Sequence, residues 1–292
     1  MRLVFEEYDS LSKYLETISK REPNNVFKHE TLSSQKSDRE FSLTGSYEEA
    51  LTLAKVGYKE GLDKIEAANK KSRHTEAAPK AMPAVGPVGY APHVPNAITG
   101  VPFSMITKTQ IEQKAKVISI LYYMGGHCGI DTSEFVKAGK NILNVIHTLE
   151  VQGYRVALYV MTAYCKSGEY AINRVQIKHW RQPSNPLKVS YPLIHPSYFR
   201  RNGFRWLETV PELKADFTYG YGRPLEGAVG NENNANDRRK WLKEQGILQD
   251  GWFYTERIEA RDNEAEKLIE KMGIVNGGGG GLNTEAAADL PF

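Results

Sequence analysis

A predicted strand, helix and second strand between residues 116 and 165 constrain this chain more than any other stretch. Residues 117–124 are a near-continuous apolar run, rich in β-branched and aromatic side chains, which is typical of a strand buried on both faces. Apolar residues then recur at three- and four-residue steps over residues 135–149, as they do along one side of a helix. Residues 156–161 have strand composition again. The pattern predicts a parallel pair of strands joined by a right-handed helical crossover.

Local signals mark both ends of the predicted helix. Asp131, Thr132 or Ser133 can cap its first turn, because a side-chain oxygen there accepts a backbone N–H that the turn leaves unpaired. Gly153 can end it, because glycine adopts the left-handed conformation that helix C-termini often need. The loop at residues 125–131 precedes the helix, at a place where open α/β sheets bind ligands. It matches neither a dinucleotide-binding motif nor a P-loop, so a tight turn is the favoured interpretation.

Composition places the chain among ordinary soluble globular proteins. Its 292 residues are 40% hydrophobic and 25% charged, enough for one large domain or two small ones. No run approaches the roughly 18 apolar residues of a membrane span, and the first residues lack the apolar segment of a secretory signal. We therefore expect a cytoplasmic protein with no membrane partner.

The N-terminal third is expected to consist of a helical module and a connector. Residues 1–71 are interpreted as the module, in which Ser10 caps one helix and Ser46 forms a capping box with Glu49 for another. Residues 72–102 contain repeated prolines, which fix φ and lack an N–H donor. They are therefore expected to form an extended connector that lies along the surface of the main domain.

The rest of the chain is expected to hold the main domain and a tail. Residues 103–275 are interpreted as an α/β core domain, within which residues 174–180 alternate as a third strand would. Residues 276–292 are a glycine-rich linker and an acidic tip, too poor in apolar area to order themselves. The predicted fold class is α/β, with a parallel-sheet core, an N-terminal helical module and a disordered C-terminal tail.

The cysteines and histidines offer little catalytic chemistry. Cys128 and Cys165 each follow a predicted strand and are interpreted as buried thiols, with a disulfide or a metal site as the alternative. The seven histidines lack zinc-ligand spacing, and no serine or cysteine stands in a known nucleophile turn. His127 beside Cys128 leaves open an enzyme that uses this loop. Otherwise we expect no catalytic residue, no metal and no cofactor.

Basic and aromatic residues are concentrated between residues 166 and 206. This stretch holds eight lysines and arginines against one acidic residue, Glu169, which makes a local net charge of +7. Basic side chains neutralise phosphates while aromatic rings stack on bases, the combination that single-strand binders use. A core of aromatic rings with arginines passing between them would have the same composition. The residues predicted to contact nucleic acid are Lys178, Trp180, Arg181, Tyr198, Arg200, Arg201 and Arg205.

Three short segments carry a resemblance to a phage- and mobile-element-encoded domain family of unknown function. They are residues 44–50 (TGSYEEA), 149–156 (LEVQGYRV) and 195–204 (HPSYFRRNGF). The strand, helix and strand also resemble the core of von Willebrand factor A-like and Rossmann-like domains. The metal motif of the von Willebrand type does not transfer, since Gly125 and Gly126 stand where its aspartate would be. The resemblance implies a fold and no activity.

The chain ends in Asp289, Leu290, Pro291 and Phe292, behind a run of glycines. This tip is similar to the acidic C-terminal tip of bacterial single-stranded DNA-binding proteins. Its chemistry suits a docking peptide, because Phe292 can fill an apolar pocket while its carboxylate pairs with a basic residue. The resemblance implies recruitment of replication or repair proteins, from the host or a phage.

The sequence thus predicts a non-enzymatic single-stranded DNA-binding protein, encoded by a phage or mobile element, that recruits partners through its tip. The alternative is a von Willebrand A-like module that binds protein and no nucleic acid.

Overall fold

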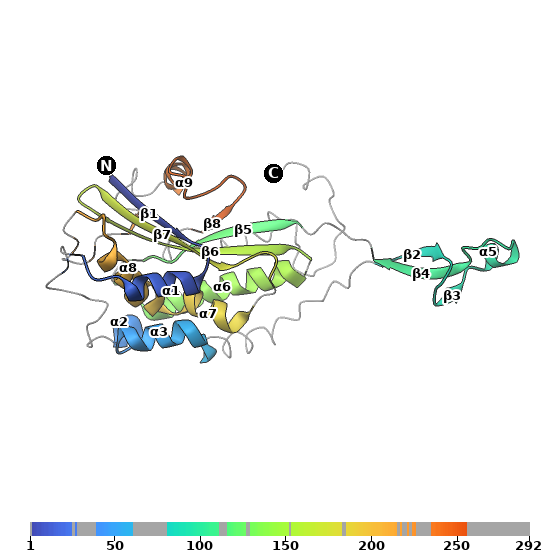
Figure 1. Cartoon of the computed structure of the whole chain (residues 1–292), viewed down its shortest axis with the longest axis horizontal. Coiled ribbons are helices and arrows are strands. Elements are labelled where there is room, and N and C mark those ends of the chain that lie inside the picture. The colour runs from blue at the N-terminus through green and yellow to red at the C-terminus, as the bar shows by residue number, and fades with distance from the viewer. Residues whose placement is uncertain are drawn as a thin grey trace.

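The computed structural model describes residues 2–24, 27, 39–60, 81–110, 116–126, 129–151, 153–182, 185–214, 217, 221, 224–225 and 235–255. At its centre is a five-stranded sheet with the strand order β1-β7-β6-β5-β8 (Figure 1). The strands are β1 (Arg2–Tyr8), β5 (Val117–Tyr123), β6 (Arg155–Lys166), β7 (Glu169–Lys178) and β8 (Phe253–Thr255).

The predicted strand, helix and strand form the middle of this sheet. β5 pairs in parallel with β6, with Val117 opposite Arg155, and α6 (Thr132–Val151) connects them. Gly153 follows the helix with φ of 89°, the left-handed conformation that was predicted for it. The predicted parallel pair is therefore confirmed.

The sheet is mixed, although most of its pairs are parallel. β1 runs parallel to β7, and β8 runs parallel to β5, whereas β6 and β7 are antiparallel neighbours. The third predicted strand is confirmed as β7, which begins several residues earlier than expected. Cys165 is buried and lies inside β6, which extends to Lys166. The prediction that Cys165 follows the end of this strand is therefore wrong. The predicted α/β class with a largely parallel sheet is confirmed.

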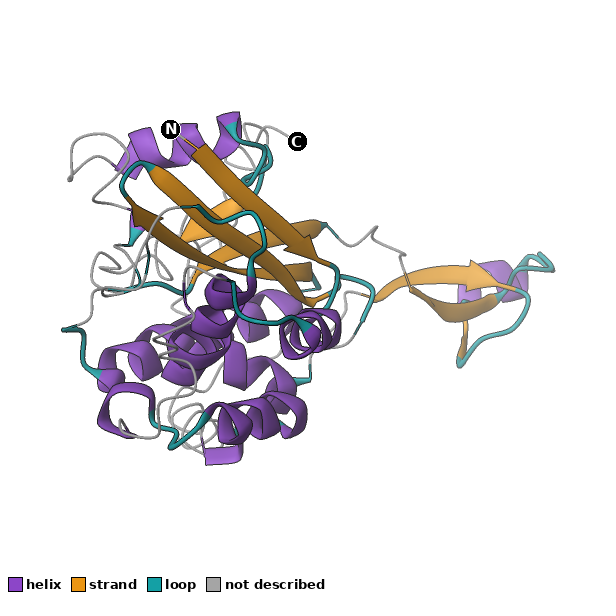
Figure 2. Ribbon diagram, turned by 60° about the vertical axis from the view of Figure 1, so that its left-hand side comes forward, coloured by secondary structure: helices purple, strands orange, loops and turns teal. Residues whose placement is uncertain are grey.

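Helices cover both faces of the sheet, in three layers (Figure 2). Side chains alternate between the faces because successive strand residues point in opposite directions. Ile120 and Tyr122 pack with the larger helical layer, whereas Leu121 and Tyr123 pack against α9 (Ala235–Glu244). The helices of the larger layer nearest the sheet are α1 (Leu11–Lys20), α6, α7 (Pro186–Ile194), the π-helix η2 (Tyr198–Gly203) and α8 (Phe204–Thr209). Its outer part, packed on these helices farther from the sheet, consists of α2 (Arg39–Ser42) and α3 (Tyr47–Val56) (Figure 1).

The N-terminal segment belongs to the same body. Its predicted caps are present: Ser10 Oγ accepts the Lys13 N–H at 3.2 Å, and Ser46 Oγ accepts the Glu49 N–H at 3.2 Å. The expectation of a purely helical module is nevertheless wrong, because the chain begins with β1, an edge strand of the main sheet. Parallel pairing with β7 satisfies the backbone groups on one side of β1, and Val4 of this strand is buried.

The proline-rich segment forms an arm that projects from the body (Figure 1). The arm comprises β2 (Ala81–Gly86), β3 (Ala91–Pro92), α5 (Val94–Ile98) and β4 (Met105–Gln110), with the strand order β2-β4-β3. The expectation of an extended connector on the body surface is wrong. Pro83 is compatible with β2 because this strand is at the edge of its sheet, where a missing N–H is tolerated. The predicted tail at residues 276–292 lies outside the described residues.

Candidate nucleic-acid interface

The structure separates the predicted nucleic-acid-binding residues into a buried and an exposed group. Lys178, Tyr198, Arg200 and Arg201 are at most 3% exposed. The expectation that they form a basic surface is wrong, because a side chain at this depth cannot reach a phosphate while the protein stays folded. Their positions support the alternative of a core crossed by basic side chains.

Arg200 and Arg201 are buried because they bind backbone carbonyl groups. The guanidinium of Arg200 donates to the carbonyl oxygens of Phe41 and, at 3.0 Å, Ile130. Arg201 Nη2 donates to the Thr44 carbonyl at 3.1 Å, and its Nε to Ser42 Oγ at 3.1 Å. Each arginine therefore satisfies acceptors in α2 or just after it, and Arg200 also satisfies one just before α6. These groups would otherwise be desolvated without a donor.

Arg205 and Lys178 have similar structural roles. Arg205, which is half-buried, donates to the carbonyl oxygens of Ile18 at 3.2 Å and Arg21 at 2.9 Å, at the C-terminal end of α1. Helix ends leave such carbonyls unpaired, and a basic side chain can satisfy them. Lys178 Nζ lies 2.6 Å from Glu150 Oε1 and donates to the Val156 carbonyl at 2.9 Å.

Trp180 and Arg181 remain accessible, and with His179 they form a cluster that we call the Trp180 stack. The His179 and Trp180 rings are stacked, with centroids 5.4 Å apart and planes 27° apart. The Arg181 guanidinium lies over the indole at 4.7 Å from its centroid. His179 Nδ1 accepts the Arg181 backbone N–H at 3.1 Å, which orients the segment after β7. Trp180 is half-buried and Arg181 is exposed.

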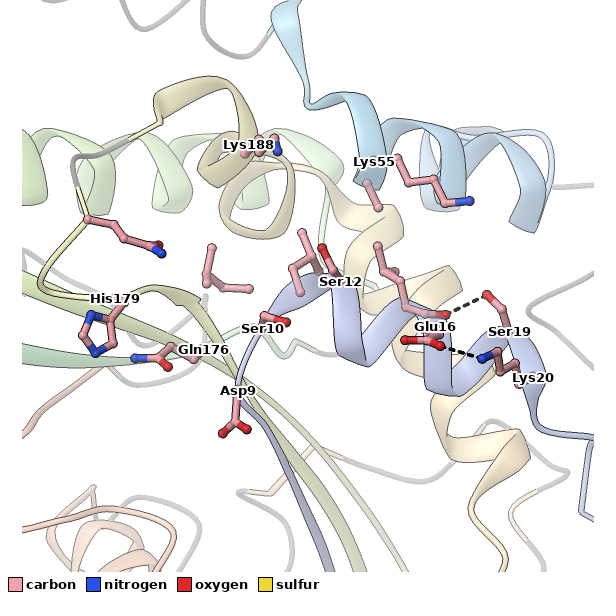
Figure 3. Close-up of a pocket in the computed structure, with 15 residues that line it drawn as sticks. Asp9, Ser10, Ser12, Glu16, Ser19, Lys20, Lys55, Gln176, His179 and Lys188 are labelled. Carbon is pink, nitrogen blue, oxygen red and sulfur yellow. Dashed lines mark hydrogen bonds and ion pairs between the residues drawn. The ribbon is translucent and has the colours of Figure 1, made fainter.

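A pocket of about 700 Å³ lies beside this stack, between the end of β7 and the start of α1 (Figure 3). His179 and Gln182, which flank Trp180 and Arg181 in the sequence, both contribute to its wall. The lining residues are Asp9, Ser10, Leu11, Ser12, Leu15, Glu16, Ser19, Lys20, Ala54, Lys55, Gln176, Ile177, His179, Gln182 and Lys188. The volume is within the range of small-molecule pockets.

The electrostatics of the pocket favour an anion. Lys55 of α3 and Lys188 of α7 reach it from one side, and the amino end of α1, where backbone N–H groups carry partial positive charge, lies opposite (Figure 3). Lys20 lies 2.5 Å from Glu16, and this bonded lysine lowers the pKa of the Glu16 carboxyl. The Asp9 carboxylate points away from the lysines (Figure 3).

The register of the sheet places two further basic residues at the end of the sheet where β7 terminates. β6 starts where β7 ends, because these strands are antiparallel, and β5 starts beside β6. The Arg155 backbone N–H donates to the Lys116 carbonyl at 2.9 Å, and both side chains are exposed. We call Lys116, Arg155, the Trp180 stack and Lys188 the basic edge. Sequence reasoning missed Lys116 and Arg155 as site residues because strand register brings them near β7. It missed Lys55 because the packing of α3 on α7 brings this lysine to the pocket.

The glycine loop after β5 is tightly packed. A Cβ at Gly125 would lie 2.4 Å from the Tyr123 ring, and one at Gly126 would lie 2.4 Å from Ile130 Cδ1. Packing against the buried Tyr123 ring therefore favours glycine at position 125, whereas Ile130 Cδ1 is the end of a flexible side chain that can shift away from a Cβ at position 126. The tight turn predicted for residues 125–131 includes residues outside the described part of the chain. His127 and Cys128, the pair behind the enzyme hypothesis, lie outside the described residues.

The described residues provide neither a metal cluster nor a membrane-crossing helix. They contain no group of three or more histidine, cysteine, aspartate or glutamate side chains that could hold a metal ion. None of the helices in this part of the chain combines the length and the apolar character needed to cross a membrane.

Comparison with known proteins identifies a family. The family model described as Domain of unknown function (DUF7192) matches residues 2–275. The chain belongs to this family. The expectation of a domain family of unknown function is thus confirmed, and the DUF7192 region includes both the body and the arm. No curated protein and no solved structure gives a significant match. The von Willebrand-like core and the DNA-binding-protein tip therefore stay predictions.

Proposed function

We propose that this DUF7192 protein is a non-catalytic single-stranded DNA-binding protein whose strand lies along the basic edge. The observation that carries the proposal is the Trp180 stack, a partly exposed group of two aromatic rings and a guanidinium beside a pocket to which three lysines contribute. Aromatic faces bind unpaired bases, and lysine and arginine bind the phosphates between them. The proposal keeps two of the residues selected from the sequence and replaces the buried ones with Lys116, Arg155, Lys55 and Lys188.

The arrangement favours a single strand over a duplex. A ring can stack only on a base whose face is exposed, and the bases of a duplex are covered by their neighbours. The basic groups spread along one edge of the sheet, from Lys116 through Arg155 to Arg181, so they can follow a backbone over several nucleotides. Binding of this kind has little sequence preference, because every base has a π-face.

A titration compares labelled single-stranded DNA, duplex DNA and RNA at several salt concentrations. We expect the single strand to bind more tightly than the duplex, with affinity falling as salt rises, because phosphate contacts release counterions. Absence of binding at low salt, or equal affinity for the duplex, would reject the proposal. RNA that binds as tightly as DNA would show that the edge does not recognise the sugar.

Recruitment of replication or repair proteins through Asp289, Leu290, Pro291 and Phe292 completes the proposal. It rests on the sequence of the tip, which lies outside the described residues. A carboxylate-bearing apolar peptide can dock in a pocket of a partner while the body stays on DNA.

A protein-interaction module without nucleic-acid binding is the second proposed function. The exposed apolar side chains of the arm favour it, since exposed apolar surface concentrated in one part of a protein marks contacts with other proteins. The same titration separates the two, because the module would bind none of the nucleic acids.

A further inference from the structure

The arm exposes an apolar surface that the proposed DNA binding does not use. Most of the large apolar side chains that are exposed in the described part of the chain lie here: Val85, Val88, Tyr90, Val94, Ile98, Val101 and Phe103. Ile98 is 80% exposed and Val88 is 79% exposed. We call these side chains the apolar tip. Val94 and Ile98 lie on α5, and Val101 and Phe103 lie on the loop between α5 and β4. Val85 lies on β2, and Val88 and Tyr90 lie on the loop between β2 and β3.

The arm has no core of its own. None of its described apolar side chains is buried, and the arm projects from the body instead of packing on it (Figures 1 and 2). β3 is two residues long and α5 five, so the arm offers little regular structure to stabilise itself. Small sheets need an apolar face covered by another element to be stable in water.

We infer that the arm is covered by the arm of a second copy of this chain, in a two-fold symmetric dimer. A segment that needs a cover whenever the chain is folded requires a partner that is always present, and another copy meets this condition. In a two-fold contact the same patch serves on both sides, so it must be complementary to itself. An apolar patch is complementary to itself. Residues 81–110 contain one charged residue, Lys108, so the electrostatic repulsion between two arms is small.

The body offers no other site of similar character. Among the described residues outside the arm, the exposed large apolar side chains are Leu43, Val56 and Val117, which lie singly on separate segments. Within the described residues, the matching apolar surface for the apolar tip of one copy is therefore the apolar tip of another copy. The exposed area also suits a dimer: these side chains expose on the order of 700 Å², against roughly 800 Å² per partner in a standard interface.

Sedimentation velocity of the full chain over a wide concentration range tests the inference. We expect a species of twice the 32.9 kDa chain mass. The double variant Val88→Asp with Ile98→Asp should dissociate it, weakening association at least about a hundredfold, because the two most exposed apolar side chains of the arm would each be replaced by a charge that the contact buries. Val56→Asp, the same change at a 64% exposed apolar residue of the body, is the matched control and should leave the dimer unchanged.

Circular dichroism of each variant verifies that the body remains folded, so a loss of mass reports the arm alone. A monomer at every concentration would overturn the inference, as would a dimer that the double variant leaves intact. A larger assembly would overturn the pairwise arrangement of arms. Wild-type protein that stays monomeric yet pellets with phospholipid vesicles would assign the apolar tip to a membrane surface instead.

Discussion

Arginine side chains that looked like phosphate ligands serve here as internal hydrogen-bond donors. Arg200 also lies over two aromatic rings, with its guanidinium carbon 3.9 Å from the centroid of Phe41 and 4.9 Å from that of Phe135. Arginine suits this task because its charge is delocalised and weakly hydrated, and its planar fork reaches several acceptors at once. The basic side chains in residues 166–206 therefore differ in how deeply they are buried, and their position in the sequence does not indicate which of them are exposed.

The first prediction concerns Arg200 and Arg201. Replacing either by alanine should lower the free energy of unfolding by about 1–3 kcal/mol, because buried carbonyl groups lose their donors. Urea denaturation followed by circular dichroism measures the loss. Arg181→Ala, at an exposed arginine of the same stretch, is the matched control and should leave stability within about 0.5 kcal/mol. Equal stability of all three variants would contradict the structural role.

His195 provides a second prediction, based on pH. It is 3% exposed, its Nδ1 lies 2.7 Å from Ser197 Oγ, and its ring contacts the edge-on ring of Tyr58 and the stacked ring of Tyr191. Burial lowers the pKa of His195 from 6.5 to about 4, although the nearby charge of Glu49 opposes the shift. Between these two values the unfolded chain binds the proton and the folded chain does not. Stability is therefore full above pH 6.5 and falls as the pH is lowered through this window.

The loss over the whole window is on the order of 3 kcal/mol. Urea denaturation at pH 7 and pH 5 measures the part that occurs while carboxylates stay ionised. His195→Gln, which keeps a hydrogen-bond acceptor and does not titrate, should flatten this slope. A slope that is the same in wild type and variant would show that another group causes it.

At the scale of elements, the contact between α6 and α7 depends on a missing side chain. A Cβ at Gly139 of α6 would lie 2.1 Å from the Leu193 carbonyl oxygen of α7. Backbone cannot yield as a flexible side chain can, so the two helices would have to separate. The close approach of these helices explains a glycine inside a long helix, where it otherwise costs stability.

The third prediction follows from this contact. Gly139→Ala should destabilise the protein by about 1–3 kcal/mol, despite the higher helix propensity of alanine, because overpacking outweighs it. Asn141→Ala, at an exposed site of the same helix, should have little effect or stabilise slightly. Thermal denaturation of both variants distinguishes them, and a stabilised Gly139→Ala protein would contradict the packing described here.

Elements with local signals could be predicted from the sequence, and elements set by distant contacts could not. The apolar run at residues 117–124 and the Gly153 stop predicted β5 and the end of α6, since burial and φ are local properties. β1 was missed because Arg2–Tyr8 becomes a strand by pairing with β7, far along the chain. The arm was missed because its prolines were taken to exclude strands, whereas an edge strand tolerates them.

The candidate site was predictable to the same limited extent. Composition indicated a basic and aromatic stretch, and among the residues selected from it Arg181 is exposed and Trp180 is half-buried. Depth was not predictable, because Arg200 and Arg205 carry the same local signal as Arg181 while their acceptors, at Phe41 and Ile18, are far away in sequence. The basic edge itself depends on strand register, which the sequence pattern left open.

At the scale of the whole molecule, the body, the arm and the C-terminal docking peptide each have a separate proposed role. The body holds the basic edge, the arm the apolar tip, and residues 289–292 the docking peptide of the proposal. Separate variants can therefore remove DNA binding, dimerisation and recruitment one at a time.

The fourth prediction concerns recruitment. Deleting Leu290, Pro291 and Phe292 should abolish capture of replication and repair proteins in a pull-down, and Phe292→Ala should do the same because it removes the only large aromatic side chain of the docking peptide. Affinity for single-stranded DNA should stay the same or rise slightly, since the acidic tip no longer competes for the basic edge. Identical partner lists from intact and truncated protein would show that the tip does not recruit.

The most direct test of DNA binding at the basic edge is a fluorescence anisotropy titration of labelled single-stranded DNA with wild type, Trp180→Ala and Lys240→Ala. Lys240 is exposed on α9, on the opposite face of the sheet, and serves as the control for a lost surface residue. We predict that Trp180→Ala weakens binding about ten- to a hundredfold, as expected for the loss of one stacked base, and that Lys240→Ala binds like wild type. Equal affinity of wild type and Trp180→Ala, or no binding by any of the three at low salt, would contradict the account.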